Sequence, residues 1–201
     1  MGENLRCSTY DTESPKSGQT IPLSGSTVVS TPYLVKISAT TTSVVGGVNY
    51  SVNLTSAQRA KIGHLYNWAA ALALEDGMVD TVFTQKQQGI CPNGWHVPSD
   101  DEWSTLINYI SDKSDGRYKT VTGWFDNNKP TESDPVFAVL PSGYAQARNI
   151  KSLGFSASFL SSTASDIRGS ASRYLSAKDD IVMKYTEVKS YATSVRCVKN
   201  D

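Results

Sequence analysis

The chain has 201 residues, with 19 lysines and arginines balanced by 19 aspartates and glutamates, and 39% of its residues are hydrophobic. The even charge balance argues against a nucleic-acid binder or a protein drawn to anionic lipid, because both need a basic surface. The apolar fraction, with four tryptophans and ten tyrosines, excludes a disordered chain. No apolar run approaches the roughly 18 residues of a membrane span.

The segment from residue 11 to 56 is rich in serine, threonine, glycine and valine, which predicts short strands and loops. Apolar and polar residues alternate from Val35 to Ala39. Gly46 and Gly47 then mark a turn before a second alternating stretch, Val48 to Val52. We therefore expect a β-hairpin here.

Thr55 could cap a helix that runs through Leu65 toward Leu74. Gly63 weakens that prediction. The stretch from Gly63 to Trp68 could equally be a buried strand that leads into the following alanines, and periodicity does not separate the two over so few residues.

A helix is expected to begin at Ser99. Glu102 stands three residues later, as a capping box requires, and Asp100 and Asp101 suit the positive end of the helix dipole. The apolar residues that follow have helical spacing and predict one buried face: Trp103, Leu106, Ile107 and Ile110.

The C-terminal half predicts an antiparallel meander of short strands. The expected strands are Val136 to Leu140, Phe155 to Leu160, Arg173 to Ser176, Ile181 to Tyr185 and Thr193 to Val198. Helices early and strands late indicate an α+β fold, with one or two helices packed on the sheet. We expect a single domain over residues 1–201, since no repeat or linker interrupts the chain.

Candidate catalytic and metal-ligating groups are few. His64 and His96 are the two histidines, and neither lies in a supporting motif, so we interpret both as packed side chains. No C-x-x-C or H-x-x-x-H spacing suggests zinc. The acidic pairs at Asp100-Asp101 and Asp179-Asp180 fit a helix start and a turn better than a calcium site.

The segment Cys91–Trp103, read with Gly63–Ala70 and Ser194–Val198, resembles the Fibrobacter succinogenes major paralogous domain. The similarity continues in Met1–Arg6 and Leu140–Tyr144. That family is common in surface proteins of gut Bacteroidetes and belongs to the C-type-lectin-like superfamily. The resemblance implies a C-type-lectin-like fold, with residues 11–56 as an insertion, and an extracellular or cell-surface location. The strand that normally precedes the first segment is absent here, which implies an open sheet edge.

The same superfamily holds the formylglycine-generating enzymes, whose segments are similar to Val97–Trp103 and Ser194–Cys197. Those enzymes use a pair of cysteines near the end of the fold, where this chain has Cys197 alone. Sugar-binding C-type lectins hold calcium with Glu-Pro-Asn or Gln-Pro-Asp and with Trp-Asn-Asp, and none of these occurs here. We therefore expect no enzyme activity and no resident cofactor, although calcium stays possible.

Cys91 precedes the expected strand and helix, and Cys197 lies in the final strand, which the fold implied by the resemblance brings near the beginning of the chain. We hypothesise that the two form a disulfide and leave Cys7 unpaired. The alternative is two buried free thiols.

The expected function is non-enzymatic recognition or adhesion, with a protein or glycan as the partner. Family members often carry an aromatic residue where Ser172 stands, and targets of diversity-generating retroelements vary such positions. The predicted ligand-facing patch consists of Tyr144, Gln146, Arg148, Ser158, Asp166, Arg168, Ser170, Ser172 and Tyr174. An ordinary solvated sheet face is the alternative.

Two other functions stay open. The chain could be a structural or tip subunit of a surface appendage such as a pilus, in which a neighbouring domain or chain supplies a β-strand to the open edge. The least favoured is an enzyme of the formylglycine-generating type.

Overall fold

A computed structural model of the chain describes residues 4–23, 26–28, 30–75, 83, 85–114, 118–119, 124, 137–178 and 181–201. The helices are α1 (Ser56–Ile62), α2 (Trp68–Ala71) and α3 (Asp100–Ser114). The strands are β1 (Leu34–Lys36), β2 (Thr40–Val45), β3 (Val48–Asn53), β4 (His64–Tyr66), β5 (Trp95–His96), β6 (Tyr144–Gln146), β7 (Asn149–Lys151), β8 (Ser156–Ala164), β9 (Gly169–Ser176), β10 (Val182–Val188), β11 (Tyr191–Ala192) and β12 (Val198–Lys199).

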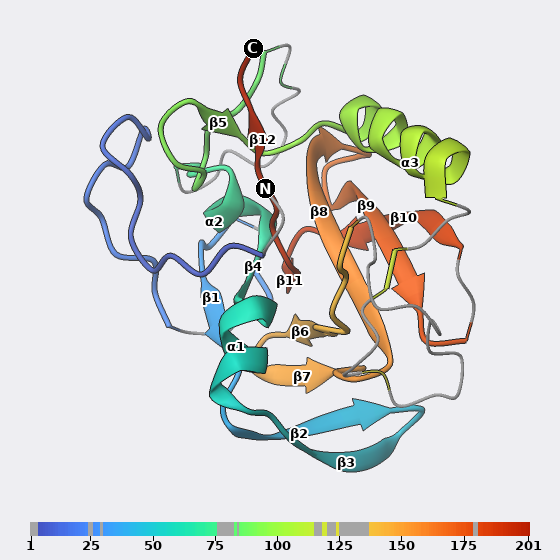
Figure 1. The fold of residues 1–201 in the computed structure, drawn as a ribbon. Helices are drawn as coiled ribbons and strands as arrows, with labels where there is room; N and C mark the ends of the chain where they lie inside the picture. The colour runs from blue at the N-terminus through green and yellow to red at the C-terminus, as the bar shows by residue number, and fades with distance from the viewer. Residues whose placement is uncertain are drawn as a thin grey trace.

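Two larger sheets form the body of the molecule (Figure 1). One has the strand order β10-β9-β8 and is antiparallel throughout. The other has the order β11-β6-β7-β2-β3 and is antiparallel except where β2 meets β7. Two small antiparallel pairs, β1-β4 and β12-β5, complete the described strands. The prediction of an α+β fold with mostly antiparallel strands is confirmed.

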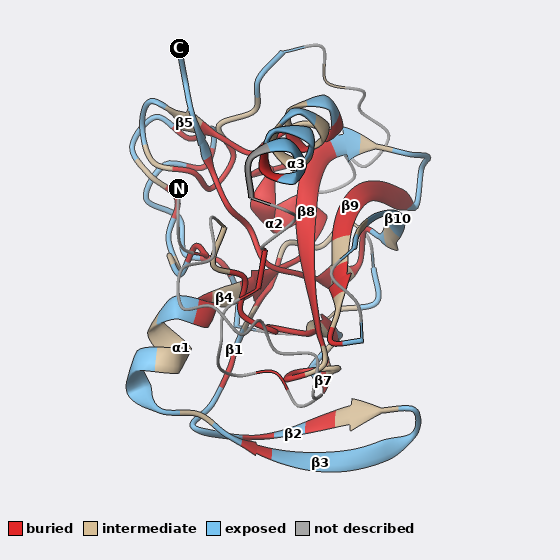
Figure 2. Ribbon diagram, turned by 45° about the vertical axis from the view of Figure 1, so that its right-hand side comes forward, coloured by how far each residue is buried: buried red, intermediate tan, exposed pale blue. Residues whose placement is uncertain are grey.

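Helix α3 covers one face of the β10-β9-β8 sheet, and the helix turns its other side to solvent (Figures 1 and 2). Trp103 packs against Phe159 of β8, with ring centroids 5.5 Å apart, and its indole Nε1–H donates to the carbonyl of Leu160 at 3.1 Å. Leu175 of β9 belongs to the same buried cluster. Burial of these large side chains contributes about 1.5 to 3 kcal/mol each.

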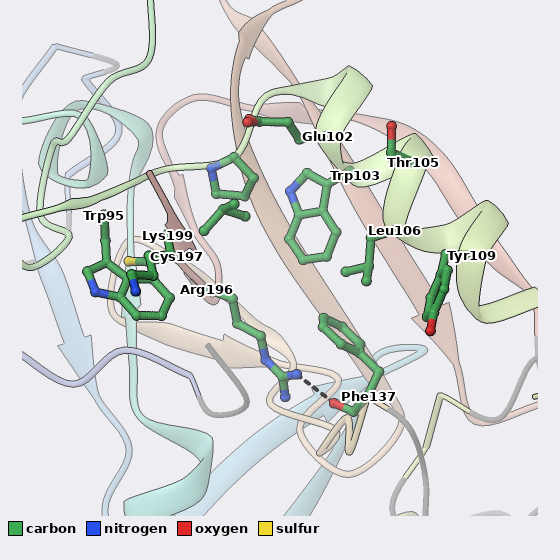
Figure 3. A pocket seen from close by; sticks show the side chains of 12 residues that line it. Trp95, Glu102, Trp103, Thr105, Leu106, Tyr109, Phe137, Arg196, Cys197 and Lys199 are labelled. Atoms are coloured by element: carbon green, nitrogen blue, oxygen red, sulfur yellow. Dashed lines mark hydrogen bonds between the residues drawn. The ribbon is translucent and has the colours of Figure 1, made fainter. Parts of the chain in front are cut away.

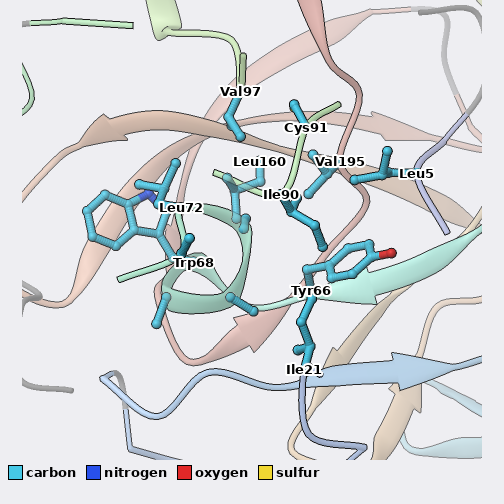
Figure 4. Packing of buried hydrophobic residues seen from close by; sticks show 14 of the residues in the cluster. Leu5, Ile21, Tyr66, Trp68, Leu72, Ile90, Cys91, Val97, Leu160 and Val195 are labelled. Carbon is cyan, nitrogen blue, oxygen red and sulfur yellow. The ribbon is translucent and has the colours of Figure 1, made fainter. Parts of the chain in front are cut away.

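A second buried cluster surrounds Trp68 at the start of α2 (Figure 4). The Trp68 side chain is fully buried, and its Nε1–H donates to the carbonyl of Ser161 at 3.1 Å. The Lys189 ammonium lies 4.2 Å from the centre of the Trp68 ring, a cation–π contact. Strand β8 is thus fixed on both sides, by Trp103 and by Trp68.

The segment Thr193–Cys197 runs through the middle of the molecule and joins its parts. Thr193 exchanges two backbone hydrogen bonds with Tyr66 of β4, at 2.8 and 2.9 Å. Ser194 bonds β8 on both sides of Phe159, and the Leu5 N–H donates to the carbonyl of Val195 at 2.9 Å.

The sequence left open whether a helix or a strand follows Thr55, and the structure has both, first α1 and then β4. Thr55 and Gln58 form a capping box at the start of α1, and the helix ends at Ile62. Gly63 follows with a φ of 76°, and a Cβ at this position would lie 2.3 Å from the carbonyl oxygen of Leu5. Only glycine fits there, so the chain leaves the helix, forms β4 and enters α2.

The predicted capping box of α3 is confirmed. The Ser99 hydroxyl accepts from the Glu102 N–H at 3.2 Å, and a Glu102 carboxylate oxygen accepts from the Ser99 N–H at 2.9 Å. Trp103 and Ile110 are buried as expected, and Leu106 and Ile107 are half-buried against the same cluster.

The predicted hairpin exists, but its first strand is Thr40–Val45 rather than Val35–Ala39. Gly46 and Gly47 form its turn with φ values of 56° and 83°, as a tight hairpin turn requires. The threonines of β2 are β-branched and favour a strand although they are not apolar. The burial expected for β3 holds at Val52 alone, because the other residues of β3 are exposed.

The later strands match the prediction in part. Strands β8, β9 and β10 overlap the expected ones but are longer. The expected strand Thr193–Val198 is wrong as a continuous strand, since bridges at Thr193 and Ser194 precede the short β12. Of Val136–Leu140, the described residues hold one isolated bridge, at Val139, and Val136 lies outside the described residues. Also outside the described residues are Met1–Glu3 and Asp179-Asp180.

The predicted pairing of Cys91 with Cys197 is confirmed. Their Sγ atoms are bonded and their Cα atoms lie 5.9 Å apart, across a sequence separation of 106 residues. A loop of this size implies a stabilisation of about 4 to 5 kcal/mol in the chain-entropy account. Cys7 is a free, half-buried thiol whose pKa is raised by burial.

The start of α3 carries an ion cluster that the sequence did not reveal. The Asp100 carboxylate pairs with Arg173 of β9, which is 2% exposed, and with Lys184 of β10, whose Nζ lies 2.6 Å away. Arg173 also donates to the Ser104 hydroxyl at 2.8 Å. Burial disfavours the charge of Asp100, but the hydrogen bonds from Lys184 and Arg173 outweigh it, so the pKa of Asp100 lies below its ordinary value.

The disulfide predicts a defined alkylation pattern. In denaturant without reductant, iodoacetamide should modify one cysteine, Cys7, and with reductant it should modify all three. Intact mass measures both states. Reduction should also lower the free energy of unfolding by about 4 to 5 kcal/mol. Modification of three cysteines without reductant would contradict the bridge.

Asp100→Ala should lower the free energy of unfolding by roughly 3 kcal/mol at pH 7, because it leaves the buried Arg173 guanidinium without its counter-charge. Asp101→Ala is the matched control, since Asp101 is exposed, and it should cost less than about 1 kcal/mol. A carboxylate with a lowered pKa stabilises the fold above its unfolded pKa, so the difference between the variants should shrink as the pH falls below about 4. Urea titrations measure both effects, and equal losses in the two variants would count against the cluster.

Candidate functional site

The nine residues of the predicted ligand-facing patch fall into three groups by exposure. Gln146, Arg148, Asp166 and Arg168 are exposed, and Tyr144 and Tyr174 are half-buried. The buried members are Ser158, Ser170 and Ser172. An open patch must be accessible, so these three serines contribute no surface to it in this structure. Contact of any of the nine with a ligand stays a prediction.

The serines of β8 and β9 lie on the same sheet face as Tyr174. Ser158 pairs with Tyr174, and Ser172 pairs with Leu160, so these residues share the sheet face away from α3. The final segment pairs with the outer edge of β8: the Ser194 N–H donates to the carbonyl of Ser158 at 3.0 Å. The Ser172 hydroxyl donates to the carbonyl of Tyr185 at 3.2 Å.

Asp166 and Arg168 lie in the turn between β8 and β9. The Asp166 carboxylate accepts hydrogen bonds from the backbone N–H groups of Arg168 and Gly169, both at 2.7 Å, and these bonds lower the pKa of Asp166. Lys189 donates to the Asp166 carbonyl at 2.8 Å. This arrangement accounts for Asp166 as a turn-forming residue, while the Arg168 side chain points outward and is exposed.

Four tyrosines gather where the two sheets meet, and we call Tyr144, Tyr174, Tyr185 and Tyr191 the tyrosine face. Tyr144 and Tyr191 stack, with ring centroids 5.7 Å apart and ring planes 18° apart. Tyr174 and Tyr185 lie 6.3 Å apart on neighbouring strands. Burial raises the pKa of Tyr144, and the nearby Glu187 and the three other tyrosines raise it further, so the two pairs lie near each other.

Two members of the tyrosine face, Tyr185 and Tyr191, were missed from the sequence. The signal for Tyr185 was present, since Met183, Tyr185 and Glu187 alternate along β10 opposite Tyr174, Ser172 and Ser170. Tyr185 is 57% exposed, and Met183 is exposed beside it. Tyr191 joins only through the pairing of β11 with β6, which no local pattern indicates.

Glu187 is the acidic group beside these tyrosines. Burial raises the pKa of Glu187 to about 7, against the opposing effect of a hydrogen bond from the Val188 N–H at 3.2 Å. A half-buried carboxyl with this pKa changes charge near neutral pH and accepts or donates hydrogen bonds accordingly.

A large apolar groove lies between α3 and β12 (Figure 3). Its volume is about 690 Å³, and its walls include Trp95, Leu106 and Tyr109, which is 59% exposed. Arg196 lies at its base and donates to the carbonyl of Phe137 at 2.6 Å. Residues of Cys91–Trp103 and Ser194–Val198, two of the segments that carry the family resemblance, line this groove.

The histidines take structural positions. His96 is buried, with Nε2 2.8 Å from a Glu102 carboxylate oxygen and Nδ1 2.7 Å from the Asn200 side-chain oxygen. His64 is half-buried, and burial lowers its pKa. Within the residues that the structure describes, no group of three or more histidine, cysteine or acidic side chains is placed to hold a metal ion.

The sequence model of one family, described as the Fibrobacter succinogenes major domain, matches residues 1–199. No curated protein and no solved structure matches the chain. Among the described helices, none is both long and apolar enough to cross a membrane.

The raised pKa of Glu187 predicts a pH-dependent stability. The folded state holds this proton up to about pH 7, whereas the unfolded chain releases it near 4.5, so stability should fall as the pH rises between these values. Glu187→Gln should flatten this slope and raise the free energy of unfolding at pH 8 by roughly 1 to 2 kcal/mol, less than the full shift because the group is partly solvated. Glu13→Gln, at an exposed position, serves as the control. An unchanged slope in Glu187→Gln would refute the assignment.

Proposed function

The chain belongs to the Fibrobacter succinogenes major domain family, and from this membership we propose that it is a non-enzymatic recognition or adhesion module. It binds a protein or glycan outside the cell, on a C-type-lectin-like fold, through the tyrosine face and the strands around it. The observation that carries the proposal is the gathering of two tyrosine pairs, one exposed and three half-buried side chains, from β6, β9, β10 and β11.

Tyrosines suit this role for physical reasons. Each offers a broad ring and a hydroxyl, and loses little conformational entropy on binding because it has only two side-chain torsions. Ring faces contact the C–H side of a sugar or the side chains of a protein, while hydroxyls and the Glu187 carboxyl supply hydrogen bonds. The exposed Met183 and Ile181 extend the apolar contact along β10.

The disulfide supports an extracellular location, because such bridges persist in oxidising compartments. It also speaks against an enzyme of the formylglycine-generating type. The resemblance assigns those enzymes a reactive cysteine pair near the end of the fold, and here Cys197 is bonded to Cys91. The buried contacts of His96 serve α3 and the C-terminal residues rather than an open site.

A diversity-generating retroelement target would vary accessible positions. Gln146, Arg148, Arg168 and Tyr185 are exposed around the tyrosine face, and we include variation at such positions in the proposal. A reverse transcriptase gene beside the coding sequence would support this part.

A second candidate is a structural subunit of a surface appendage, and the groove of Figure 3 favours it. Among the described strands, β12 pairs with β5 alone. Asn200 donates to Gly94 across this pair, so the N–H and C=O of Lys199 point away from β5, as alternation in an antiparallel ladder requires. An apolar strand from a neighbouring chain could add there and fill the groove.

The tyrosine face predicts the outcome of a matched substitution experiment. Tyr144→Ala with Tyr185→Ala should weaken binding to a hit on an array of bacterial polysaccharides and mucin glycans by at least about tenfold, since an aromatic anchor contributes roughly 1 to 3 kcal/mol. The melting temperature should stay within a few degrees because Tyr185 is exposed and Tyr144 is only half-buried.

Tyr109→Ala is the control, since Tyr109 is an exposed tyrosine of α3 in the apolar groove. It should leave array binding unchanged. Loss of binding in Tyr109→Ala alone, or concentration-dependent polymers that disappear in that variant, would favour the structural subunit instead. Unchanged binding in the double variant would overturn the tyrosine face as the binding surface.

A further inference from the structure

The tyrosine face continues into a second feature along the outer side of the five-stranded sheet. Residues that pair across this sheet share one side of it: Tyr191 pairs with Gln146, Gln146 with Asn149, and Tyr144 with Lys151. Ala145, Ile150 and Ala192 alternate with them and are buried on the other side. The same outer side continues across Val44 to β2 and β3.

A groove of about 430 Å³ lies at the far end of this outer side, between β1, β2 and the turn from β6 to β7. Hydroxyl and amide side chains make up most of its lining. The polar residues that line it are Lys36, Ser38, Thr40, Thr41, Thr42, Asn49, Arg148 and Asn149.

The groove carries positive charge without a compensating acid. Lys36 of β1 and Arg148 of the turn from β6 to β7 both line it, and no aspartate or glutamate is among the described residues of the lining. Lys151, the next outward residue of β7, stands between this groove and Tyr144, with which it pairs. The carboxyl of Glu187, on β10 of the other sheet, lies near Tyr144 at the tyrosine end.

The polar ends in the groove are available to a ligand. Thr40 and Thr41 donate to protein oxygens, but within the described part of the chain the side chains of Lys36, Arg148 and Asn149 make no hydrogen bond or ion pair. Asn49 is in the same situation. Two cations and two amides of this lining are therefore exposed and without protein partners among the described residues, so a ligand can replace the water around them.

The buried Tyr33 lies between the turn that carries Arg148 and the strand that carries Tyr191. Its hydroxyl donates to the carbonyl of Ser190, next to Tyr191. Burial raises the pKa of Tyr33, and the backbone of Ala147, the residue before Arg148, opposes that rise. Ala147 itself has a φ of 53°.

We propose that this groove binds the acidic group of an anionic saccharide, a carboxylate or a sulfate, at Lys36 and Arg148. The sugar chain continues past Lys151, so that a neighbouring ring lies on Tyr144 and Tyr191. This inference rests on the proposed recognition function and names its ligand class. Arginine forms paired hydrogen bonds with either acidic group, the amides and threonines match sugar hydroxyls, and the stacked tyrosines offer a ring-sized platform.

The test compares two probes that differ only in charge, hexagalacturonate and its fully methyl-esterified form, with a heparin hexasaccharide as the sulfated arm. Calorimetry at 50 mM and 300 mM salt measures the affinities. At least one acidic probe should bind about tenfold or more tightly than the neutral ester, with an affinity that falls as salt rises. Carboxylate and sulfate are distinguished by which acidic probe binds.

Lys36→Glu with Arg148→Glu should abolish binding of the acidic probe, and Lys61→Glu, an exposed charge reversal on α1 outside the groove, should not. Both variants should keep the parent's melting temperature within a few degrees. Failure of both acidic probes, equal binding of acid and ester, or unchanged binding in the double variant would overturn the inference. Binding of neutral array glycans that is lost in Tyr144→Ala with Tyr185→Ala would leave the proposed function standing even then.

Discussion

The fold depends on how the segment Thr193–Cys197 is held in the middle of the molecule. Its backbone bonds β4 through Thr193, β8 through Ser194 and the N-terminal segment through Leu5. Its side chains close the same centre. Arg196 donates to the Asn4 side chain at 2.8 Å and lies 4.2 Å from the ring of Phe137, and Cys197 is bonded to Cys91. Parts of the chain that are nearly 200 residues apart therefore share one buried set of contacts.

This central closure frees the outer surfaces for function. Trp103 fixes β8 on one side, and Trp68 and the final segment fix it on the other. The tyrosines of β9 and β10 are therefore not needed to hold this sheet in place. The five-stranded sheet similarly buries one side and exposes the other. Most residues that carry the family resemblance lie at the centre or around the apolar groove, and of the tyrosine face Tyr144 alone belongs to one of these segments.

Local patterns in the sequence predicted the elements whose causes are local. Capping at Ser99, the turn at Gly46-Gly47 and the α+β class were all readable, and the resemblance led to the disulfide. Contacts made across the chain were not readable. The pairing of β11 with β6, which brings Tyr191 to Tyr144, has no sequence pattern, nor has the ion cluster of Asp100 with Arg173. Of the predicted patch, the accessible residues surround the tyrosine face, while Ser170 and Ser172 lie on the same face as Tyr174 but are buried between its larger side chains.

We propose that the outer side of β6, β7, β10 and β11 is the binding surface. Hydrogen–deuterium exchange, with and without a saturating polysaccharide taken from an array hit, is the sharpest test because it reports every strand at once. We expect slower exchange in β6, β7, β10 and β11, with β5, α3 and β12 unchanged. Protection confined to α3 and β12 would contradict it and would place the binding surface at the apolar groove.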